Sequence, residues 1–565
     1  MKLRGAEILI RALAEEGVDT IFGYPGGSVL DTYDEIYKSQ FKHILVRHEQ
    51  GAAHAADGYA RASGKVGICL VTSGPGATNT VTGIVTAYMD SIPIVVFTGQ
   101  VPTTLIGSDA FQEADITGIT RPCTKHNFIV RKVEDLARTV KEALYIARSG
   151  RPGPVLVDLP KDVAQAETDY SASGPQKTPS HDPIYIPDLE ALNETLQLIK
   201  QARKPVLMVG GGVTLGRASE ELRKFVEKVQ IPVTHTLMGI GAFPGTDPLS
   251  LGMLGMHGTY YANMAVSQCD LLIAVGARFD DRVTGNLASF APDAKIIHID
   301  IDAASINKNV LVDLPIISDC KSALQQLNKM LHQNHFTTPE ADRKQWLDQI
   351  RAWKDYAPLS YAEGEAIKPQ YVIETLYKLT KGDAIITTEV GQNQMWAAQF
   401  YHFNEPNRFL SSGGLGTMGY GFPAAIGAQV ACPDKTVIDI AGDGSIQMNI
   451  QELATVVNYN IPVKVAILNN GFLGMVRQWQ ELFYGKRYSH TSISQVPDFV
   501  RLAEAYGAVG LRAMTPEEVE PTIEKALNTP GPVIMDFAVD PEEGVYPMVK
   551  PGSPISEMVL GKEDE

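Results

Sequence analysis

Two apolar runs end in polar, glycine-rich turns: Ile440-Ala441-Gly442-Asp443-Gly444-Ser445 and Ile467-Leu468-Asn469-Asn470-Gly471. The runs 436–440 and 463–468 are typical of buried strands, and residues 446–457 between them carry apolar side chains at helical spacing. A strand, a helix and a second strand in this order predict two neighbouring parallel strands. Asp443 and Asn470 would then lie at their carboxyl ends, where open α/β sheets bind ligands.

The residue types at these two turns favour a magnesium-diphosphate cofactor. Asp443 and Asn470 supply hard oxygen ligands, and Mg²⁺ usually keeps phosphate oxygens among its other ligands. The backbone at Gly444 and Ser445 can approach a diphosphate at the start of a helix. The turn is not a P-loop, because no Gly-Lys-Ser/Thr follows it. Taken alone, Gly442–Ser445 would more simply be a tight turn with an Asp N-cap, but the Asn pair at the next strand end makes the pattern more specific.

Composition indicates a large acidic protein of several domains. The chain has 565 residues, is 44% apolar and carries a net charge of −16, which predicts about three to four domains and no nucleic-acid or anionic-membrane partner. Its sequence contains no apolar run long enough for a membrane span, and charges interrupt the first helix too early for a signal peptide. Five scattered cysteines without CxxC spacing are typical of reduced thiols in a cytoplasmic protein.

Alternation of strands and helices predicts an α/β fold with three doubly wound parallel-sheet domains. We expect domains at 1–165, 191–330 and 369–540, polar linkers at 166–190 and 331–368, and a tail at 541–565 that is a candidate lid over a site. In the first domain, the apolar run that starts at Ile44 should be a strand with Glu49 just past its end. The middle domain should contain strands at 205–209, 232–234, 271–275, 296–299 and 315–317, which suggests a nucleotide crevice although the full GxGxxG spacing is missing.

The first and third domains share a pattern. Residues 58–64 parallel residues 421–427, and in both places a strand, a Gly-rich loop ending in Asn79 or Asn449 and an Ile-Pro strand start follow. We interpret this as a divergent internal repeat in which one copy kept the metal loop. Chance similarity between two α/β domains is an equally good explanation from sequence alone.

Several longer motifs carry a resemblance to a known family. They include Arg47-His48-Glu49-Gln50, Ala110-Phe111-Gln112-Glu113, Arg278-Phe279-Asp280-Asp281-Arg282, Gly416-Thr417-Met418-Gly419 and Gln478-Trp479-Gln480. With them the chain resembles, over essentially its whole length, the catalytic subunits of acetohydroxyacid synthase (acetolactate synthase), which are thiamine-diphosphate (ThDP) enzymes. The Arg278–Arg282 and Gln478–Gln480 runs are similar to the FAD-containing biosynthetic members. Gly471 departs from the larger polar residue expected after the Asn pair.

The resemblance implies roles for individual residues. Asp443, Asn470 and the Phe472 carbonyl would bind Mg²⁺, and Glu49 would share a proton with N1′ of the aminopyrimidine. A carboxylate among small apolar residues should have a raised pKa, which suits that exchange. The remaining residues assigned to ThDP are Val390, Gly391, Gln392, Asn393, Gly416, Met418, Gly444 and Ser445, with Met418 as an apolar wedge under the bent cofactor.

Substrate and flavin residues follow from the same resemblance. Phe111, Gln112 and Lys161 would lie on the Glu49 side of the reaction. Arg282 and Trp479 would select a second 2-ketoacid, as a carboxylate clamp and an apolar wall, although an Arg beside Asp280 and Asp281 is by default a surface ion pair. FAD would contact Arg151, Gly210, Gly211, Gly212, Thr236, Leu237, Met256, His257, Gly276, Arg278, Asp300, Ile301 and Asp319.

The function implied is the decarboxylation of pyruvate and the condensation of the resulting hydroxyethyl-ThDP carbanion with pyruvate or 2-ketobutyrate. The products, 2-acetolactate and 2-aceto-2-hydroxybutyrate, lead to valine, leucine and isoleucine. The resemblance also implies a homodimer or dimer of dimers, active sites shared between chains, and a small regulatory subunit. A ThDP- and FAD-dependent pyruvate oxidase is the alternative enzyme, and a catalytically silent cofactor-binding scaffold is the alternative class.

Overall fold

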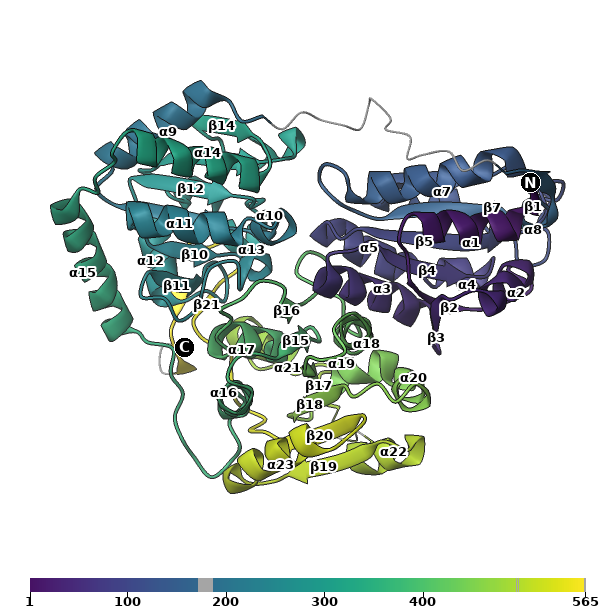
Figure 1. Ribbon diagram of the computed structural model, residues 1–565. Coiled ribbons are helices and arrows are strands. Elements are labelled where there is room, and N and C mark those ends of the chain that lie inside the picture. Colours follow the sequence, from purple (N-terminus) through teal and green to yellow (C-terminus); the bar gives the residue numbers. More distant parts are fainter. Residues whose placement is uncertain (171–185, 494, 496, 563–565) are drawn as a thin grey trace.

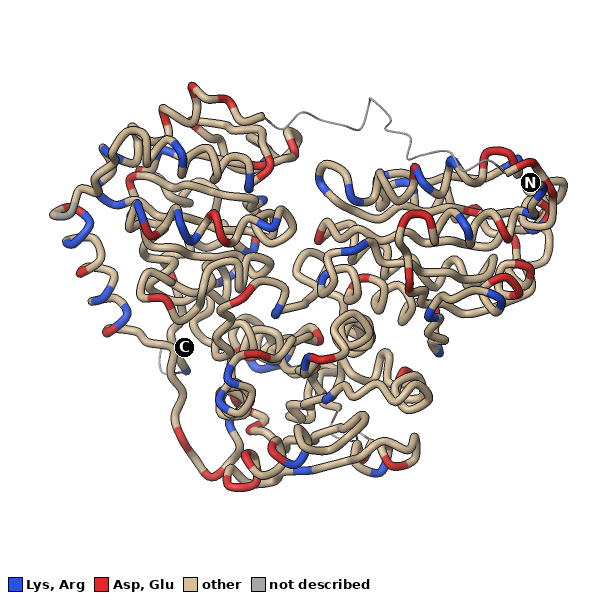
Figure 2. Tube along the Cα trace, in the orientation of Figure 1, with Lys and Arg blue, Asp and Glu red and all other residues tan. Residues whose placement is uncertain are grey.

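The computed structural model has three lobes, each built on its own sheet (Figure 1), and describes residues 1–170, 186–493, 495 and 497–562. Each lobe contains a six-stranded parallel sheet, which confirms the α/β fold class with three doubly wound domains. Acidic and basic residues occur on all three lobes (Figure 2). Within the described ranges, no helix has the length and apolar character that a membrane crossing requires.

The first and third sheets have the same topology. The first runs β3(Lys42–Leu45)-β2(Thr20–Tyr24)-β4(Gly67–Val71)-β5(Ile94–Gln100)-β7(Val155–Pro160)-β6(His126–Ile129). The third runs β16(Phe409–Leu410)-β15(Ile385–Thr388)-β17(Val437–Gly442)-β18(Lys464–Asn469)-β20(Val533–Ala538)-β19(Val509–Ala513). If each set is numbered in chain order, both read 2-1-3-4-6-5. This shared order supports the interpretation of an internal repeat.

Helices that occupy equivalent places in the two repeats pack directly on each other. α3(Glu49–Ser63) and α18(Gly421–Ala431) approach so closely that a Cβ on Gly58 would lie 2.1 Å from the Ala424 carbonyl oxygen. A Cβ on Gly427 would lie 1.9 Å from the Ala55 carbonyl oxygen. Only glycine fits at these two contacts, so the small residues that revealed the repeat also join the first domain to the third.

The middle sheet has a different order, β11(Ser250–Met253)-β10(Val233–His235)-β9(Pro205–Val209)-β12(Leu271–Val275)-β13(Lys295–Asp300)-β14(Leu314–Ile317). In chain order this reads 3-2-1-4-5-6, the arrangement of dinucleotide-binding sheets, with a crevice between the first and fourth strands. The five predicted strands are present. β11 was missed, because Ser250 and Gly252 interrupt its apolar pattern.

Helices cover both faces of each sheet. The first domain contains α1(Gly5–Glu15), α2(Leu30–Lys38), α3, α4(Pro75–Thr78), α5(Val81–Asp90), α6(Ile116–Thr120), α7(Val133–Arg148) and α8(Lys161–Gln165). The middle domain contains α9(Leu189–Gln201), α10(Gly211–Leu215), α11(Ser219–Val229), α12(Tyr260–Gln268), α13(Asp281–Thr284), α14(Cys320–Gln333) and α15(Glu340–Tyr356). The third contains α16(Pro369–Thr380), α17(Gln392–Phe400), α18, α19(Asp443–Ile446), α20(Leu453–Asn458), α21(Gly474–Phe483), α22(Phe499–Tyr506) and α23(Pro516–Asn528).

Two local predictions near the site were wrong. The helix expected over 446–457 is broken into α19, a 3-10 segment Gln447–Glu452 and α20, because Asn449 leaves the helical region (φ −133°) and donates a hydrogen bond from its side chain to the Gly419 carbonyl. The expected strand is β3, which ends at Leu45, so Glu49 does not follow a strand end directly. It is instead the first residue of α3, whose N-cap is His48.

The two linkers and the tail are more ordered than their composition indicates. β8(Glu167–Asp169) pairs with β1(Lys2–Arg4), while residues 171–185 of the first linker lie outside the described residues. α15 in the second linker packs on the middle domain through Trp346 and Trp353. In the tail, β21(Met548–Val549) pairs with β22(Met558–Val559), and the Val549 N–H donates to the Met256 carbonyl oxygen at 2.8 Å. This part of the tail therefore lies against the middle domain, whereas Val545 near its start exchanges two hydrogen bonds with Gln478 of the third domain.

Candidate active site

The two predicted metal ligands meet at the edge of the third sheet. β17 and β18 are parallel neighbours, and they end in the turns that carry Asp443 and Asn470. The N–H of Gly471 donates to Asp443 Oδ2 at 3.0 Å, and the N–H of Phe472 donates to Asn470 Oδ1 at 3.0 Å. Gly471 has φ +72°, a conformation that favours glycine, which accounts for its departure from the larger residue expected there.

Predicted diphosphate residues surround this corner. Gln392 Oε1 accepts a hydrogen bond from Asn470 Nδ2 at 3.2 Å, and Asn393 Nδ2 donates to the carbonyls of Glu389 and Ile440 at 2.9 and 2.8 Å. Ser445 Oγ lies 3.2 Å from the Gly442 N–H, which donates to it. The turns at the ends of β15, β17 and β18 thus form one glycine-rich surface, with donors and hard oxygens side by side.

The electrostatics of the corner fit a cation. Burial of Asp443 raises the pKa of its carboxyl group from 3.8 to about 7, despite hydrogen bonds from backbone N–H groups that lower it. A buried carboxylate with only amide donors around it is poorly compensated as an anion. A divalent cation would supply the missing positive charge, so Asp443, Asn470 and the Phe472 carbonyl fit a Mg²⁺ site by donor type.

Glu49 lies at a second corner, in the first domain. Its Oε2 accepts a hydrogen bond from Asn79 Nδ2 at 2.9 Å, and its Oε1 lies 3.3 Å from the place that a Cβ on Gly76 would take. Asn79, the residue that marks the sequence repeat, thus orients this carboxylate. Glu49 is partly exposed, and the absence of a side chain at Gly76 leaves space beside its carboxylate.

The loop that carries Phe111 and Gln112 packs on the same turn. Gln112 has φ +59°, and its backbone lies within 3.0 Å of the place that a Cβ on Gly74 would take. Glu113 ties the loop together by accepting from the N–H groups of Gly107 and Ala110. The side chain of Phe111 is 88% exposed in the single chain. Nearby, Lys161 begins α8, and its neighbour Asp162 accepts from the Thr103 N–H at 2.9 Å.

A cavity of about 600 Å³ lies where the three domains meet, a volume suited to a cofactor. Its wall includes all but one of the residues predicted to contact FAD: Arg151, Gly211, Gly212, Thr236, Leu237, Met256, His257, Gly276, Arg278, Asp300, Ile301 and Asp319. Gly210 is the exception. It lies behind the wall, where a Cβ would be 2.2 Å from the Gly276 carbonyl oxygen, so it lets the two glycine turns at the crevice touch.

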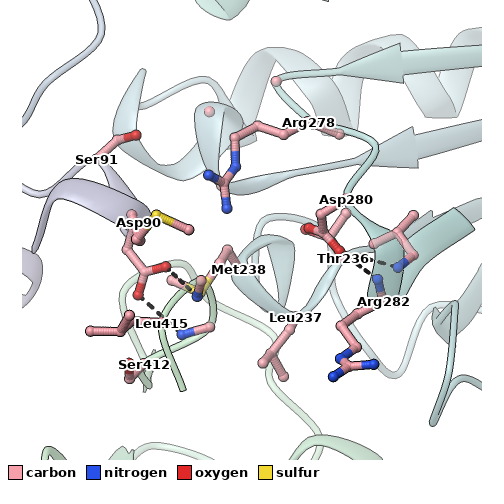
Figure 3. Close-up of a pocket in the computed structure, with 18 of the residues that line it drawn as sticks. Asp90, Ser91, Thr236, Leu237, Met238, Arg278, Asp280, Arg282, Ser412 and Leu415 are labelled. Carbon is pink, nitrogen blue, oxygen red and sulfur yellow. Dashed lines mark hydrogen bonds between the residues drawn. The ribbon is translucent and has the colours of Figure 1, made fainter. Parts of the chain in front are cut away.

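The glycine turns and the position of Arg278 suit a dinucleotide. Gly212 and Gly276 follow β9 and β12, the two strands between which the order of the sheet reverses. Arg278 extends into the cavity between the first and middle domains (Figure 3), where it can pair with a diphosphate. The residues present therefore fit FAD by topology, volume and charge.

The same cavity contains the predicted substrate pair and part of the thiamine site. Val390, Gly391, Gly416, Arg282 and Trp479 all line it. The guanidinium of Arg282 lies 5.8 Å from the centre of the Trp479 ring, and the indole Nε1 has no partner among the described residues. The default interpretation of Arg282 as a surface ion pair is partly right, because it lies 3.6 Å from the exposed Asp281.

Within the described residues, Glu49 and Asp443 share no hydrogen bond or ion pair. Glu49, Phe111 and Gln112 surround the Ser73–Gly76 turn of the first domain, whereas Asp443 and Asn470 lie at the sheet edge of the third. The backbone N–H groups of Arg47 and His48, which precede Glu49, donate instead to the carboxylate of Glu452 in the third domain. Within one chain, the two groups of predicted residues therefore belong to different domains.

Sequence reasoning missed charged residues of the cavity wall, among them Asp90 and Arg148. Asp90 ends α5 and hydrogen-bonds the backbone of the third domain (Figure 3). Its signal in the sequence was a lone carboxylate within the otherwise uncharged run from Val81 to Phe97. Met89, Ser91, Met475 and the segment from Ser412 to Leu415 also line the cavity without having been predicted.

Comparisons with known proteins agree with this geometry. Three thiamine pyrophosphate enzyme models match the chain: the N-terminal TPP-binding domain at 3–119, the central domain at 192–327 and the C-terminal TPP-binding domain at 389–537. The chain is 50% identical to the acetolactate synthase large subunit of Haemophilus influenzae and 50% identical to the isozyme 3 large subunit of Escherichia coli, each over 100% of this chain and 99% of the relative. It is 53% identical to the acetolactate synthase of Mycobacterium bovis, over 98% of this chain and 90% of that protein. Since these matches span all three domains, the chain belongs to the acetolactate synthase family of thiamine-pyrophosphate enzymes.

Proposed function

We propose that the protein joins a two-carbon unit from pyruvate to a second 2-ketoacid, with pyruvate or 2-ketobutyrate as acceptor. The products would be 2-acetolactate and 2-aceto-2-hydroxybutyrate, in the first common step of branched-chain amino-acid biosynthesis. The observation that carries this proposal is the Arg282–Trp479 pair, which lies in one cavity with Val390 and Gly391 of the thiamine site. A guanidinium and a flat apolar ring together suit a small 2-ketoacid.

The residues of the chain hold groups and move protons around the thiamine cofactor. When bound, ThDP supplies a nucleophilic carbon and an electron sink for decarboxylation. Asp443, Asn470 and the Phe472 carbonyl would hold its Mg²⁺. Glu49, oriented by Asn79, would accept and return a proton at N1′ of the aminopyrimidine.

Arg282 and Trp479 would act after decarboxylation. Arg282 would bind the carboxylate of the second ketoacid, and Trp479 would cover its alkyl group and exclude water. The larger part of the same cavity would hold FAD, whose support is the 3-2-1-4-5-6 sheet and the position of Arg278. A flavin here would have a site continuous with the substrate pair.

Sharing of the site between two chains is part of the proposal. Phe111 is 88% exposed beside the Glu49 turn, and on the other half Met448 and Val476 are 55% and 51% exposed. Exposed apolar side chains at both half-sites suit burial against a second copy. A two-fold dimer would bring the Glu49 half of each chain to the Asp443 half of its partner and form two sites.

Two further expectations come from the relatives and the cysteines. The relatives of Haemophilus influenzae and Escherichia coli reported above are named large subunits, so we include a small regulatory subunit as partner. All five cysteines are free, which suits the reducing cytoplasm.

One assay tests the proposal against its alternatives. Purified protein is incubated with pyruvate, ThDP, Mg²⁺ and FAD, and acetolactate, peroxide and acetyl products are measured. Acetolactate is the expected product. Peroxide with an acetyl product would establish the oxidase instead, and the absence of any turnover would leave a cofactor-binding scaffold. The oxidase is disfavoured because it needs no clamp for a second ketoacid.

A further inference from the structure

The carboxylate of Asp90 reaches from the first domain into a loop of the third. Asp90 is the last residue of α5, and its side chain is fully buried. Its Oδ1 accepts a hydrogen bond from the Gly414 N–H at 2.7 Å, and its Oδ2 accepts from the Gly413 N–H at 3.1 Å (Figure 3). Two successive backbone donors on one carboxylate fix both the position and the direction of the loop.

A buried arginine compensates the charge of this carboxylate. Arg61 Nη2 lies 2.9 Å from Asp90 Oδ2, and Arg61 Nε lies 2.6 Å from Asp57. The same guanidinium donates from Nη1 to the Ser411 carbonyl oxygen at 2.9 Å. The start of the loop is thus held by Arg61, and the next two residues are held by Asp90.

The loop leads directly to the predicted thiamine residues. It continues from Gly414 through Gly416 to Met418, and Gly416 lines the cavity. Thr417 is fixed as well, because its hydroxyl lies 2.8 Å from that of Thr86, one turn before Asp90 on α5. α5 therefore holds the loop at two points, on either side of Gly416.

The other side of the same helix end belongs to the predicted flavin site. Ser91 follows Asp90 and accepts a hydrogen bond from Arg151 Nε at 2.8 Å, and Arg151 also pairs with Asp302 at 3.0 Å. Met89, Asp90, Ser91 and Arg151 all line the cavity. A ligand that fills this cavity would restrain residues 89–91 from one side, while Asp90 restrains the loop from the other.

We propose that Asp90 is a positioning residue that couples the flavin cavity to the thiamine loop. The inference rests on the proposed FAD and ThDP sites and adds an interaction between them. Flavin bound against residues 89–91 holds the Asp90 carboxylate in place against the N–H groups of Gly413 and Gly414. The thiamine loop is then ordered, so ThDP binds more tightly to the flavin-loaded enzyme. By thermodynamic linkage, ThDP must strengthen flavin binding by the same factor.

The experiment measures ThDP affinity at fixed Mg²⁺ in the flavin-free and the FAD-loaded enzyme, with tryptophan fluorescence as the signal. Flavin loading is measured separately by absorbance. For the wild type we expect ThDP to bind about fivefold or more tightly with FAD present. In Asp90→Asn, ThDP affinity should fall about tenfold, since one acceptor and the charge are lost. The benefit from FAD should also disappear, so the flavin-free and FAD-loaded forms of the variant should bind ThDP with equal affinity.

Ser91→Ala is the matched control. It removes the hydroxyl that Arg151 contacts and leaves the Asp90 carboxylate in place, so flavin affinity should fall while the ThDP affinity of the flavin-free enzyme is unchanged. Thr86→Val provides a second variant should Asp90→Asn fail to fold, because it removes the other contact between α5 and the loop and should reduce the coupling.

The outcomes separate this inference from the proposed function. A wild type that binds no flavin would reject the proposed cofactor. Flavin and ThDP that bind with no mutual effect would reject the coupling alone. Wild-type coupling in Asp90→Asn, or in Thr86→Val where Asp90→Asn is unfolded, would also overturn it.

Discussion

The guanidinium of Arg282 lies 5.8 Å from the centre of the Trp479 ring, although the two residues come from different domains. Neither is needed to bind the first pyruvate in the proposed reaction. Arg282→Ala should therefore lower the rate of condensation more than the rate of decarboxylation. Loss of charge-assisted hydrogen bonds to a carboxylate predicts about a 10- to 100-fold lower kcat/KM for the acceptor.

The measurement is the ratio of CO₂ released to acetolactate formed. Asp281→Asn is the matched control, because Asp281 is exposed and its pairing with Arg282 at 3.6 Å is solvent-screened. It should leave the ratio unchanged. Equal losses of CO₂ release and acetolactate in Arg282→Ala would contradict the assignment of Arg282 to the acceptor.

The sheet edge of the third domain makes a separate prediction for cofactor binding. Asp443→Ala and Asn470→Ala should each lose Mg²⁺-dependent ThDP binding, because each removes a hard oxygen from the same corner. FAD absorbance and the circular dichroism spectrum should be unchanged, since neither residue lines the large cavity. Calorimetric titration with ThDP and Mg²⁺ checks the effect, and normal affinity in Asp443→Ala would remove Asp443 from the metal site.

Glu49→Gln should bind ThDP but activate it slowly. An amide keeps the hydrogen bond from Asn79 and the size of the side chain, but it cannot take a proton from the cofactor. General acid–base effects of this kind amount to about 10²–10⁴-fold. Hydrogen–deuterium exchange at C2 of bound ThDP reports this step directly. Exchange at the wild-type rate in Glu49→Gln would show that Glu49 has another role.

Glu452 lies at the junction of the first and third domains, and its buried carboxyl group should make the stability of the protein depend on pH. It accepts hydrogen bonds from the N–H groups of Arg47 and His48, and burial raises the pKa of its carboxyl group from 4.5 to about 7. Because the pKa is higher in the folded state, the contribution of Glu452 to stability is fully present below about pH 4.5. It is lost as the pH rises through about 7.

Glu452→Gln should therefore make the melting temperature less sensitive to pH between pH 5 and pH 8. Glu389 and Asp158 also have pKa values raised to about 7 by burial, so the difference between wild type and variant is the quantity to compare. Melting curves at several pH values supply it. If the melting temperatures of the wild type and of Glu452→Gln change by the same amount between pH 5 and pH 8, Glu452 does not titrate in this range.

The sequence predicted those parts of the site that depend on strand ends. Asp443 and Asn470 were placed correctly beside each other because a parallel sheet brings the carboxyl ends of neighbouring strands to one edge. The residues expected to contact FAD came from the resemblance, and all of them except Gly210 line one cavity. Short sequence patterns were therefore enough to place those residues whose positions follow from the order of the strands in the sheet.

Tertiary contacts decided the features that the sequence did not reveal. Asn449 breaks a helix whose apolar spacing continues, because its side chain bonds the Gly419 carbonyl of a distant loop. Asp90 was passed over because its partners, Gly413 and Gly414, lie more than three hundred positions along the chain. Neither contact leaves a periodic signal.

The separation of Glu49 from Asp443 supports the last prediction, that each active site is built from two chains. Within one chain the two residues lie in different domains without a shared contact, and the apolar side chains at both half-sites are exposed. Glu49→Gln and Asp443→Ala should each be nearly inactive alone. A mixed dimer would carry both lesions in one site and none in the other.

Unfolding and refolding the two variants together should therefore restore activity. With half of the dimers mixed and one good site of two in each, recovery should approach about a quarter of the wild-type activity. Differently tagged chains verify that mixed dimers have formed. Each variant refolded alone is the control and should remain inactive. If each site lay within one chain, every site would keep one lesion, so verified mixed dimers without activity would reject the shared site.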